Sequence, residues 1–216
     1  MQNKTLIFDY DGTIHNTIHL YKPAFLKAYA YLVRHGFKPP KDFKDEEITQ
    51  FLGQNPKEMW QNFAPDLSDS IRKTASQIIS NAMKEGMHQG EALLYPNALK
   101  TLEELKKRGY ELIFLSNCKI AYMKSHAKLF KLDTVFNTMV CAEMYNYISK
   151  TDIIAKIFPE DQKPLAIIGD RYHDIEAGKA HQIITVACLY GYGKESEHQG
   201  ADYFIHDIKE LLGIFK

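Results

Sequence analysis

Two carboxylates separated by one residue follow the first apolar run of the chain. Residues 6–8 (Leu-Ile-Phe) lead into Asp9, and Asp11 is followed by Gly-Thr. The apolar run is short and a glycine follows soon after it, which favours a buried strand over a helix. Side chains at a strand end alternate between two sides, so Asp9 and Asp11 are expected to project together. Their mutual repulsion is relieved by a divalent cation, and hard cations such as Mg²⁺ prefer oxygen ligands. The stretch therefore predicts a metal-assisted site, with an ordinary Asp-Gly turn as the alternative.

Further polar side chains stand where later apolar segments end. Ser116 and Asn117 follow one predicted strand, Asp170 follows another, and Asp174 comes four residues later. Lys150 begins a predicted helix that follows a third strand. In a parallel sheet these positions share the edge at which ligands bind.

Each of these residues also has an ordinary structural explanation. Asp174 could serve only as a helix N-cap, Ser116-Asn117 only as a turn, and Lys150 only as a surface residue. Their joint arrival at one edge of a sheet, together with Asp9 and Asp11, is what favours a functional site.

The pattern of apolar residues divides the chain into a helical block and an alternating block. Between residues 17 and 90, apolar residues within 24–33 mark one amphipathic helix that ends near Gly36. Further helices are predicted over 45–52, from 56 onward, and from about 69 to a stop at Gly86. From residue 93 onward, amphipathic helices alternate with strands predicted at 111–115, 138–141, 165–168, 183–189 and 203–205.

Continuously apolar strands that alternate with helices predict an α/β fold with a doubly wound, Rossmann-like parallel sheet. The helical block would be inserted directly after the first strand. The predicted domains are therefore a core of residues 1–16 and 91–216 and an inserted helical cap of residues 17–90.

Composition indicates an ordinary soluble globular protein. Of the 216 residues, 45% are hydrophobic and 25% are charged, and the 27 basic residues balance the 27 acidic ones. No net field favours nucleic acid or an anionic membrane, so neither is expected as a partner.

Cysteine use and the start of the chain bear on the compartment. Cys118, Cys141 and Cys188 are odd in number and far apart, which fits a reducing compartment and predicts that Cys118 is a packing residue. The few residues before the first strand leave no room for a signal peptide, and no apolar stretch approaches the ~20 residues that span a bilayer. We therefore expect a cytoplasmic protein.

Four short motifs, in this order along the chain, resemble those of the haloacid dehalogenase-like hydrolases. They are the hydrophobic-Asp-x-Asp-Gly-Thr segment at 8–13, Ser116 at a strand end, Lys150, and Gly-Asp-x-x-x-Asp at 169–174. The tail, with Leu-Tyr-Gly-Tyr-Gly at 189–193 and Gly-Ala-Asp-Tyr at 200–203, resembles the phosphoglycolate phosphatase-like branch. The motifs are weak singly and strong as an ordered set.

The resemblance implies a Mg²⁺-dependent phosphatase that acts through an aspartyl-phosphate intermediate. In that mechanism Asp9 is the nucleophile, and Asp11 protonates the leaving group and then activates water. The implied metal ligands are Asp9, the backbone carbonyl of Asp11, Asp170 and, in a supporting role, Asp174. The phosphoryl group would be bound by the residues Ser116, Asn117 (through its backbone amide), Lys150, Gly12 and Thr13.

Some positions depart from the family pattern. Asn16-Thr17 stands where Asp-Ser is common, which removes none of the chemistry. Thr151 follows the lysine where many relatives have Pro, so Lys119 and Lys163 remain alternatives to Lys150. Dehalogenases of this family typically lack the second carboxylate, and its presence here as Asp11 favours a phosphatase.

Two other functions stay open at this point. A sugar phosphomutase of the same superfamily usually carries a His on the first cap helix, where this chain has Tyr21, although His15 and His19 lie close by. A non-catalytic phosphate-binding protein is the third hypothesis, because fold alone does not determine function.

The expected partner is a small phosphorylated metabolite, and the chain is expected to be a monomer or a homodimer. Phosphoglycolate, a nucleotide, a sugar phosphate and pyrophosphate are all chemically acceptable substrates. The candidates in the cap to contact the leaving group are the loop near Gly53, Gln54 and Asn55, and the residues Lys57 and Trp60. Of these, Trp60 is expected to pack in the interior of the cap.

Overall fold

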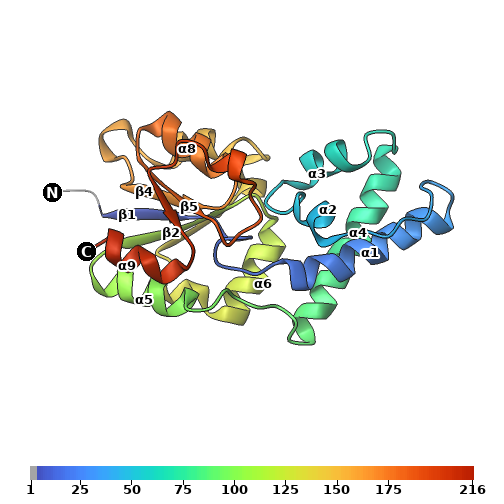
Figure 1. Cartoon of the computed structure of the whole chain (residues 1–216), viewed down its shortest axis with the longest axis horizontal. Coiled ribbons are helices and arrows are strands. Elements are labelled where there is room, and N and C mark those ends of the chain that lie inside the picture. Colours follow the sequence, from blue (N-terminus) through green and yellow to red (C-terminus); the bar gives the residue numbers. More distant parts are fainter. Residues whose placement is uncertain (1–3) are drawn as a thin grey trace. The chain divides into compact units, whose positions relative to one another are not determined.

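The computed structural model of this chain describes residues 4–216, which include a six-stranded parallel sheet (Figure 1). The strand order is β3-β2-β1-β4-β5-β6. The strands are β1 (Thr5–Phe8), β2 (Glu111–Ser116), β3 (Thr138–Cys141), β4 (Ala166–Gly169), β5 (Ile184–Cys188) and β6 (Tyr203–Ile205). The expected absence of a signal peptide concerns the start of the chain, and residues 1–3 lie outside the described part. The α/β fold class is confirmed.

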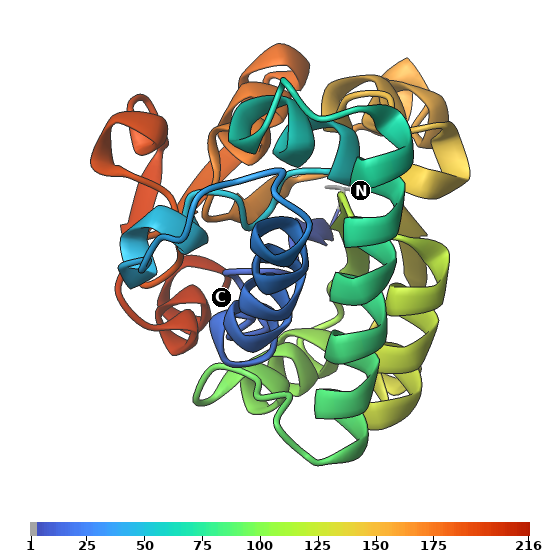
Figure 2. The same ribbon diagram turned by 90° about the vertical axis from the view of Figure 1, so that its right-hand side faces the viewer.

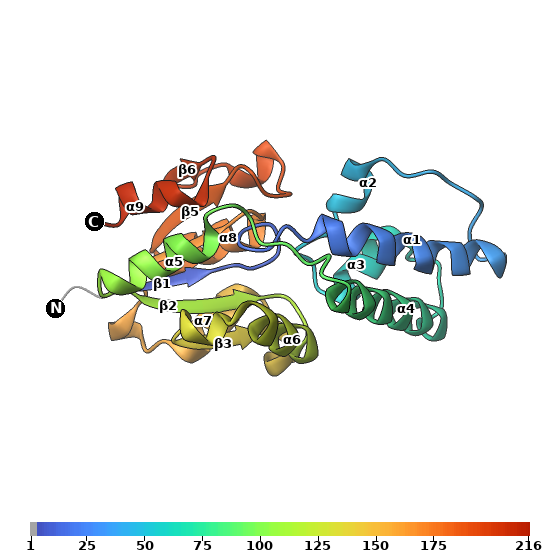
Figure 3. The same cartoon turned by 90° about the horizontal axis from the view of Figure 1, so that it is seen from below.

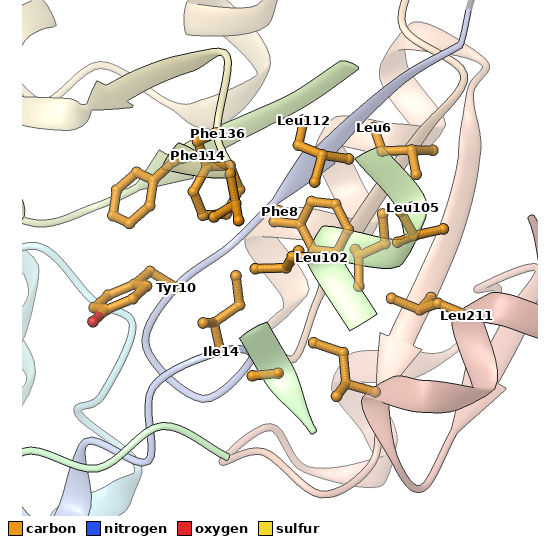
Figure 4. Packing of buried hydrophobic residues seen from close by; sticks show 14 of the residues in the cluster. Leu6, Phe8, Tyr10, Ile14, Leu102, Leu105, Leu112, Phe114, Phe136 and Leu211 are labelled. Carbon is orange, nitrogen blue, oxygen red and sulfur yellow. The ribbon is translucent and has the colours of Figure 1, made fainter. Parts of the chain in front are cut away.

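The sheet is covered on both faces because its strands are apolar on both sides. In β1, Leu6 and Phe8 belong to one core cluster and Ile7 to the other, and all three are fully buried. Figure 4 shows the first cluster, in which Phe8 packs with Phe114 and Leu102 from other elements. Successive side chains of a strand point to opposite faces of the sheet, and here helices cover both faces, so each side chain enters a core.

Helices cover both faces of the sheet. On the face of the first cluster lie α5 (Ala98–Lys107), α6 (Ile120–Phe130) and α9 (Leu211–Ile214). On the opposite face lie α7 (Lys150–Ile157) and α8 (Tyr172–His181). Figure 1 shows α8 on one side of the strands and α5 and α9 on the other. Within residues 4–216, no helix combines the length and apolarity needed to cross a membrane.

A second compact unit, residues 16–93, is helical and follows β1 in the chain. It contains α1 (Ile18–Arg34), α2 (Asp45–Thr49), α3 (Pro56–Phe63) and α4 (Asp69–His88). The first unit comprises residues 1–15 and 94–216. The division therefore falls one to three residues from the boundaries expected from sequence.

The two long helices of the helical unit, α1 and α4, lie side by side (Figures 2 and 3). Leu20, Ala24, Ala28 and Leu32 of α1 recur every four residues and are buried. This stripe faces the interior of the unit, as the apolar spacing predicts.

The expected stop of α4 at Gly86 is wrong, because the helix continues to His88. Gly86 is buried inside the helix, and a Cβ atom there would collide with the Leu20 side chain of α1 and the Glu91 carboxylate. The residue therefore permits close helix packing. The chain leaves the helix at Gly90, whose positive φ of 80° suits a glycine.

Smaller differences concern other element boundaries. Helix α1 spans Ile18–Arg34 and contains the predicted apolar stripe, whereas α2 ends at Thr49 rather than at residue 52, and the strand after α7 spans Ala166–Gly169. The final helix expected from Asp207 begins as a 3₁₀ turn, Ile208–Glu210, which leads into α9. Ends of this kind are set by capping and local packing, which apolar spacing does not encode.

Gly86→Leu is expected to lower the free energy of unfolding by about 1–3 kcal/mol, because the new side chain overpacks the contact between α4 and α1. Chemical denaturation followed by far-UV circular dichroism measures this change. Ser80→Leu, at an exposed position of the same helix, is the control and should stay within about 0.5 kcal/mol of the parent. Equal effects of the two substitutions would contradict the role given to Gly86.

Candidate functional site

The polar residues predicted from sequence stand at the carboxyl edge of the sheet. Asp9 follows β1, and Asp170 follows β4, which is paired with β1 in the sheet. From β1 the chain moves outward to β2 and β3 and then returns to the other side of β1 as β4. Such a reversal of strand order opens a crevice at the carboxyl ends of the strands, where ligands bind in doubly wound sheets.

Three buried carboxylates and one lysine meet at this edge. Asp9, Asp170 and Asp174, here called the aspartate cluster, have carboxylate oxygens that lie within 4.8 Å of one another. The Lys150 Nζ atom donates to Asp9 Oδ1 at 2.5 Å and to Asp174 Oδ1 at 2.6 Å. The exposed fraction of Asp9 and of Lys150 is 3%, and that of the other two residues is 0%.

Local structure explains how Asp174 and Lys150 reach the cluster. Lys150 is the first residue of α7, whose N-cap Ser149 accepts a hydrogen bond from the Asp152 amide. Asp174 lies in the first turn of α8, and its Oδ2 accepts from the Arg171 amide at 3.2 Å. Asp174 therefore makes a helix-capping bond and also contacts Lys150, so a capping role and a place in the site are compatible.

Asp170 is held by residues from two other loops. Thr13 Oγ1 donates to its Oδ1 at 3.4 Å, and the Tyr192 amide donates to its Oδ2 at 2.7 Å. A Cβ atom on Gly12 would collide with the Asp170 carboxylate, and the φ of Gly12 is 93°. Gly12 is thus required both by its backbone conformation and by the space beside Asp170.

The charges of the cluster perturb one another. Burial is the largest influence on Asp9 and raises its pKa to about 7, while Lys150 opposes that shift and Asp174 adds to it. Burial, followed by the charge of Asp9, raises the pKa of Asp170 well above its ordinary value. Burial alone lowers the pKa of Lys150, but Asp174 and Asp9 outweigh it and the net shift is upward.

This arrangement fits a divalent cation. The Asp9 Oδ2 atom is buried and has no hydrogen-bond partner among residues 4–216, although its carboxylate is one of three that converge there. A single lysine charge does not balance three carboxylates. A hard cation with oxygen ligands supplies both the missing charge and a partner for Asp9 Oδ2, so the donor set is suited to Mg²⁺.

Asp11 has a different environment from the aspartate cluster. Its side chain is 14% exposed, and its Oδ1 accepts a hydrogen bond of 2.7 Å from the Tyr122 hydroxyl of α6. His15 Nδ1 lies 3.3 Å from the same oxygen and 3.1 Å from the Tyr122 hydroxyl. No sequence pattern indicates Tyr122, which is 111 positions from Asp11, and the sequence suggests a role for His15 only under the mutase alternative.

A second buried histidine, His126 of α6, lies behind His15. The two ring centroids are 4.7 Å apart, and His126 Nδ1 is within 2.7 Å of the Tyr10 hydroxyl. Burial, aided by His15, lowers the pKa of His126 to about 3. The imidazole is therefore neutral throughout the ordinary pH range.

The remaining predicted residues lie as follows. Ser116 and Asn117 are buried at the end of β2, which neighbours β1 at the same edge of the sheet. Burial raises the pKa of the Cys118 thiol well above its ordinary value, in keeping with a packing role.

Lys163 is exposed, and Lys119 is the N-cap residue of α6. Of the three candidate lysines, Lys150 is therefore the one whose ammonium group bridges Asp9 and Asp174.

In the helical unit, the candidate specificity residues have ordinary structural roles. Trp60 is 3% exposed and its indole nitrogen donates to Ser76 Oγ at 2.6 Å, so the expected packing role is confirmed. Asn55 caps α3 by accepting from the amides of Lys57 and Glu58. The Lys57 side chain is exposed.

Comparison with known proteins identifies a family for most of the chain. The family model described as haloacid dehalogenase-like hydrolase matches residues 6–188. The pyrophosphatase PpaX of Listeria monocytogenes is 24% identical over 219 residues, covering 98% of this chain and 96% of the relative.

Solved structures show the same fold. A haloacid dehalogenase-like family hydrolase from Streptococcus pneumoniae superposes with a TM-score of 0.81 at 24% identity, covering 99% of each chain. A predicted phosphoglycolate phosphatase from Haemophilus somnus gives a TM-score of 0.81 at 20% identity, over 100% of this chain and 99% of that one.

Lys150→Met is expected to lower the free energy of unfolding by about 3–5 kcal/mol in metal-free buffer, because it leaves Asp9 and Asp174 buried without a counter-charge. Urea denaturation in the presence of a chelator measures the loss. Lys163→Met, at an exposed lysine, should change stability by no more than about 0.5 kcal/mol. A loss of similar size in both variants would show that the bridge does not stabilise the fold.

The lowered pKa of His126 predicts a loss of stability in acid. The ordinary pKa of a histidine is 6.5, so His126 of the unfolded chain binds a proton below that pH. In the folded state the same residue binds a proton only below about pH 3. The free energy of unfolding is therefore unaffected by His126 above pH 6.5. Below that pH it declines by up to about 1.4 kcal/mol per pH unit. His126→Gln should flatten the decline measured by urea denaturation between pH 6.5 and 4.5, whereas His206→Gln, at an exposed residue, should leave its slope unchanged.

Proposed function

The chain belongs to the haloacid dehalogenase-like hydrolases, and on that basis we propose that it is a Mg²⁺-dependent phosphatase. Its proposed substrate is a small phosphorylated metabolite, and its proposed intermediate is an aspartyl phosphate on Asp9. The observation that carries this proposal is the state of the Asp9 carboxylate. One oxygen accepts from Lys150, and the other is buried within the aspartate cluster without a hydrogen-bond partner in the described chain.

The positions of the residues support the roles proposed for them. Asp9 attacks phosphorus, so that a bond from its carboxylate oxygen forms while the bond to the leaving group breaks. Lys150 holds one oxygen of Asp9 and thereby fixes the orientation of the carboxylate. Ser116 and the Asn117 amide, at the end of the adjacent strand, would bind phosphoryl oxygens.

Proton transfer is assigned to Asp11. It gives a proton to the leaving oxygen in the first step, and in the second it takes a proton from the water that attacks phosphorus and releases Asp9. Its partial exposure, in contrast to the buried cluster, is consistent with exchange of protons with substrate and water.

The residues that would hold Mg²⁺ are Asp9, Asp170 and the backbone carbonyl of Asp11, with Asp174 in support. When bound, the cation would offset the negative charge of the carboxylates and of the transferring phosphoryl group.

The substrate class is proposed from the relatives and from the resemblance of the tail. Several curated relatives are named pyrophosphatase PpaX, and a structural neighbour is titled a predicted phosphoglycolate phosphatase. The candidate substrates therefore remain pyrophosphate, phosphoglycolate, nucleoside monophosphates and sugar phosphates. A panel of these compounds, assayed for phosphate release, separates a phosphatase for monoesters from a pyrophosphatase.

The mutase alternative predicts a different product. Incubation with a hexose 1-phosphate, followed by ³¹P NMR, distinguishes release of inorganic phosphate from isomerisation of the sugar phosphate. Conversion to an isomeric sugar phosphate would refute the phosphatase proposal. Absence of turnover across the whole panel would favour a protein that only binds phosphate.

Asp9→Asn is expected to reduce hydrolysis of 4-nitrophenyl phosphate by more than about 10³-fold, because an amide cannot serve as the nucleophile. Asp133→Asn, at an exposed carboxylate, should retain full activity. Undiminished turnover by the Asp9 variant would remove Asp9 from the mechanism.

Removal of divalent cations with a chelator is expected to abolish activity, and added Mg²⁺ should restore it. Mg²⁺ should also raise the melting temperature of the parent protein, since a ligand that binds only the folded state stabilises it. The melting temperature of Asp170→Ala should respond far less. A stabilising effect of equal size in both proteins would place the cation elsewhere.

A further inference from the structure

We propose that Tyr122 and His15 are positioning residues for Asp11, which hold one carboxylate oxygen so that the other exchanges the proton with the leaving group. This inference rests on the proposed function, because it concerns the acid of the phosphatase reaction. It adds two residues that the motifs of the family resemblance do not contain.

The direction of the hydrogen bonds follows from the distances. The Tyr122 hydroxyl has one hydrogen, and the shorter contact, 2.7 Å, is to Asp11 Oδ1. A carboxylate accepts only, so Tyr122 is the donor in that bond. His15 Nδ1 then faces the same carboxylate oxygen at 3.3 Å and the Tyr122 oxygen at 3.1 Å. With the tyrosine hydrogen directed to Asp11, Nδ1 must carry a hydrogen and donate as well.

Two donors on Oδ1 determine where the acidic proton of Asp11 resides. An oxygen that accepts from a phenol and faces an imidazole N–H is a poor site for a further hydrogen. The proton is therefore carried on Oδ2, and the fixed Oδ1 sets the plane of the carboxyl group. Proton transfer to a leaving oxygen requires this control of position, because its rate falls steeply when the acid is misaligned.

The surroundings of His15 restrict the movement of its ring. The His15 ring is fully buried and stacks on Tyr10, with ring centroids 5.2 Å apart and an angle of 8° between the planes. The His126 ring also packs against the His15 ring, and the two ring centroids are 4.7 Å apart. The backbone closes the same loop, since the His15 amide donates to the Tyr10 carbonyl and the Gly12 amide to the His15 carbonyl. These backbone hydrogen bonds restrain the turn that carries Asp11.

The dependence of rate on the leaving group separates positioning of the acid from a general effect on folding. An alkyl phosphate has a strongly basic leaving group that needs a proton, whereas 4-nitrophenolate departs without one. The ratio kcat/KM reports the steps up to departure of the leaving group, so it excludes the later attack of water.

With the Mg²⁺-loaded full chain, Tyr122→Phe is expected to lower kcat/KM for an alkyl phosphate by about tenfold or more. For 4-nitrophenyl phosphate the loss should be smaller than about threefold. Tyr110→Phe is the matched control, since it removes a hydroxyl that donates to the Lys216 carbonyl at 3.2 Å, outside the site. The control should leave the two substrates in their parental ratio, and unfolding midpoints of both variants report any loss of folding.

Two substitutions test His15 separately. His15→Phe keeps a ring in the stack but removes the donor, and it should repeat the selective loss seen in Tyr122→Phe. His15→Asn carries an amide nitrogen at the same number of bonds from Cα as Nδ1, and it should recover activity toward the alkyl phosphate relative to His15→Phe. Lack of recovery would exclude His15 as a donor.

The outcomes distinguish this inference from the proposed function. If the parent protein hydrolyses both substrates and Tyr122→Phe reduces both equally, or neither, the positioning role is wrong while the phosphatase proposal stands. If the parent protein hydrolyses neither compound nor any member of the metabolite panel, the proposed function fails and the inference fails with it.

Discussion

Electrostatic repulsion among buried carboxylates is the constraint on which the site depends. Asp9, Asp170 and Asp174 have oxygens within 4.8 Å of one another, in an interior where such proximity is costly. The Lys150 ammonium group compensates two of them directly. Burial is the largest cause of the raised pKa values of Asp9 and Asp170, and the charges of neighbouring carboxylates add to it. The same excess of negative charge suits the cluster to a divalent cation.

The sheet concentrates these charges without exposing them. Strands β1 and β4 are paired neighbours, so the residues that follow them meet at one edge, and α7 and α8 begin near that edge with Lys150 and Asp174 in their first turns. Asp11 points into a separate environment of Tyr122 and His15. The division gives two neighbouring carboxylates, Asp9 and Asp11, distinct surroundings, which is the condition for one to act as nucleophile and the other as acid and base.

Much of the fold and of the site was accessible from the sequence because it depends on local patterns. The apolar strand at 165–168 and the helix from Lys150 are encoded by runs of neighbouring residues, and Asp9, Asp170 and Lys150 were singled out by their places after strands. The stop expected at Gly86 was wrong for a physical reason. A glycine that ends a helix and one that admits a neighbouring helix look alike in sequence, and only the Leu20 side chain packed against it tells them apart.

The sequence by itself determined the alternation of strands and helices, the inserted helical segment and the identity of the carboxylates, since periodicity and motif order are properties of adjacent residues. The tertiary structure decided which groups meet. It selected Lys150 from three candidate lysines by bringing its ammonium group to Asp9 across 141 positions. It also brought Tyr122 to Asp11 across 111 positions. Contacts of that range arise from the packing of helices on the sheet, which no local spacing of residues encodes.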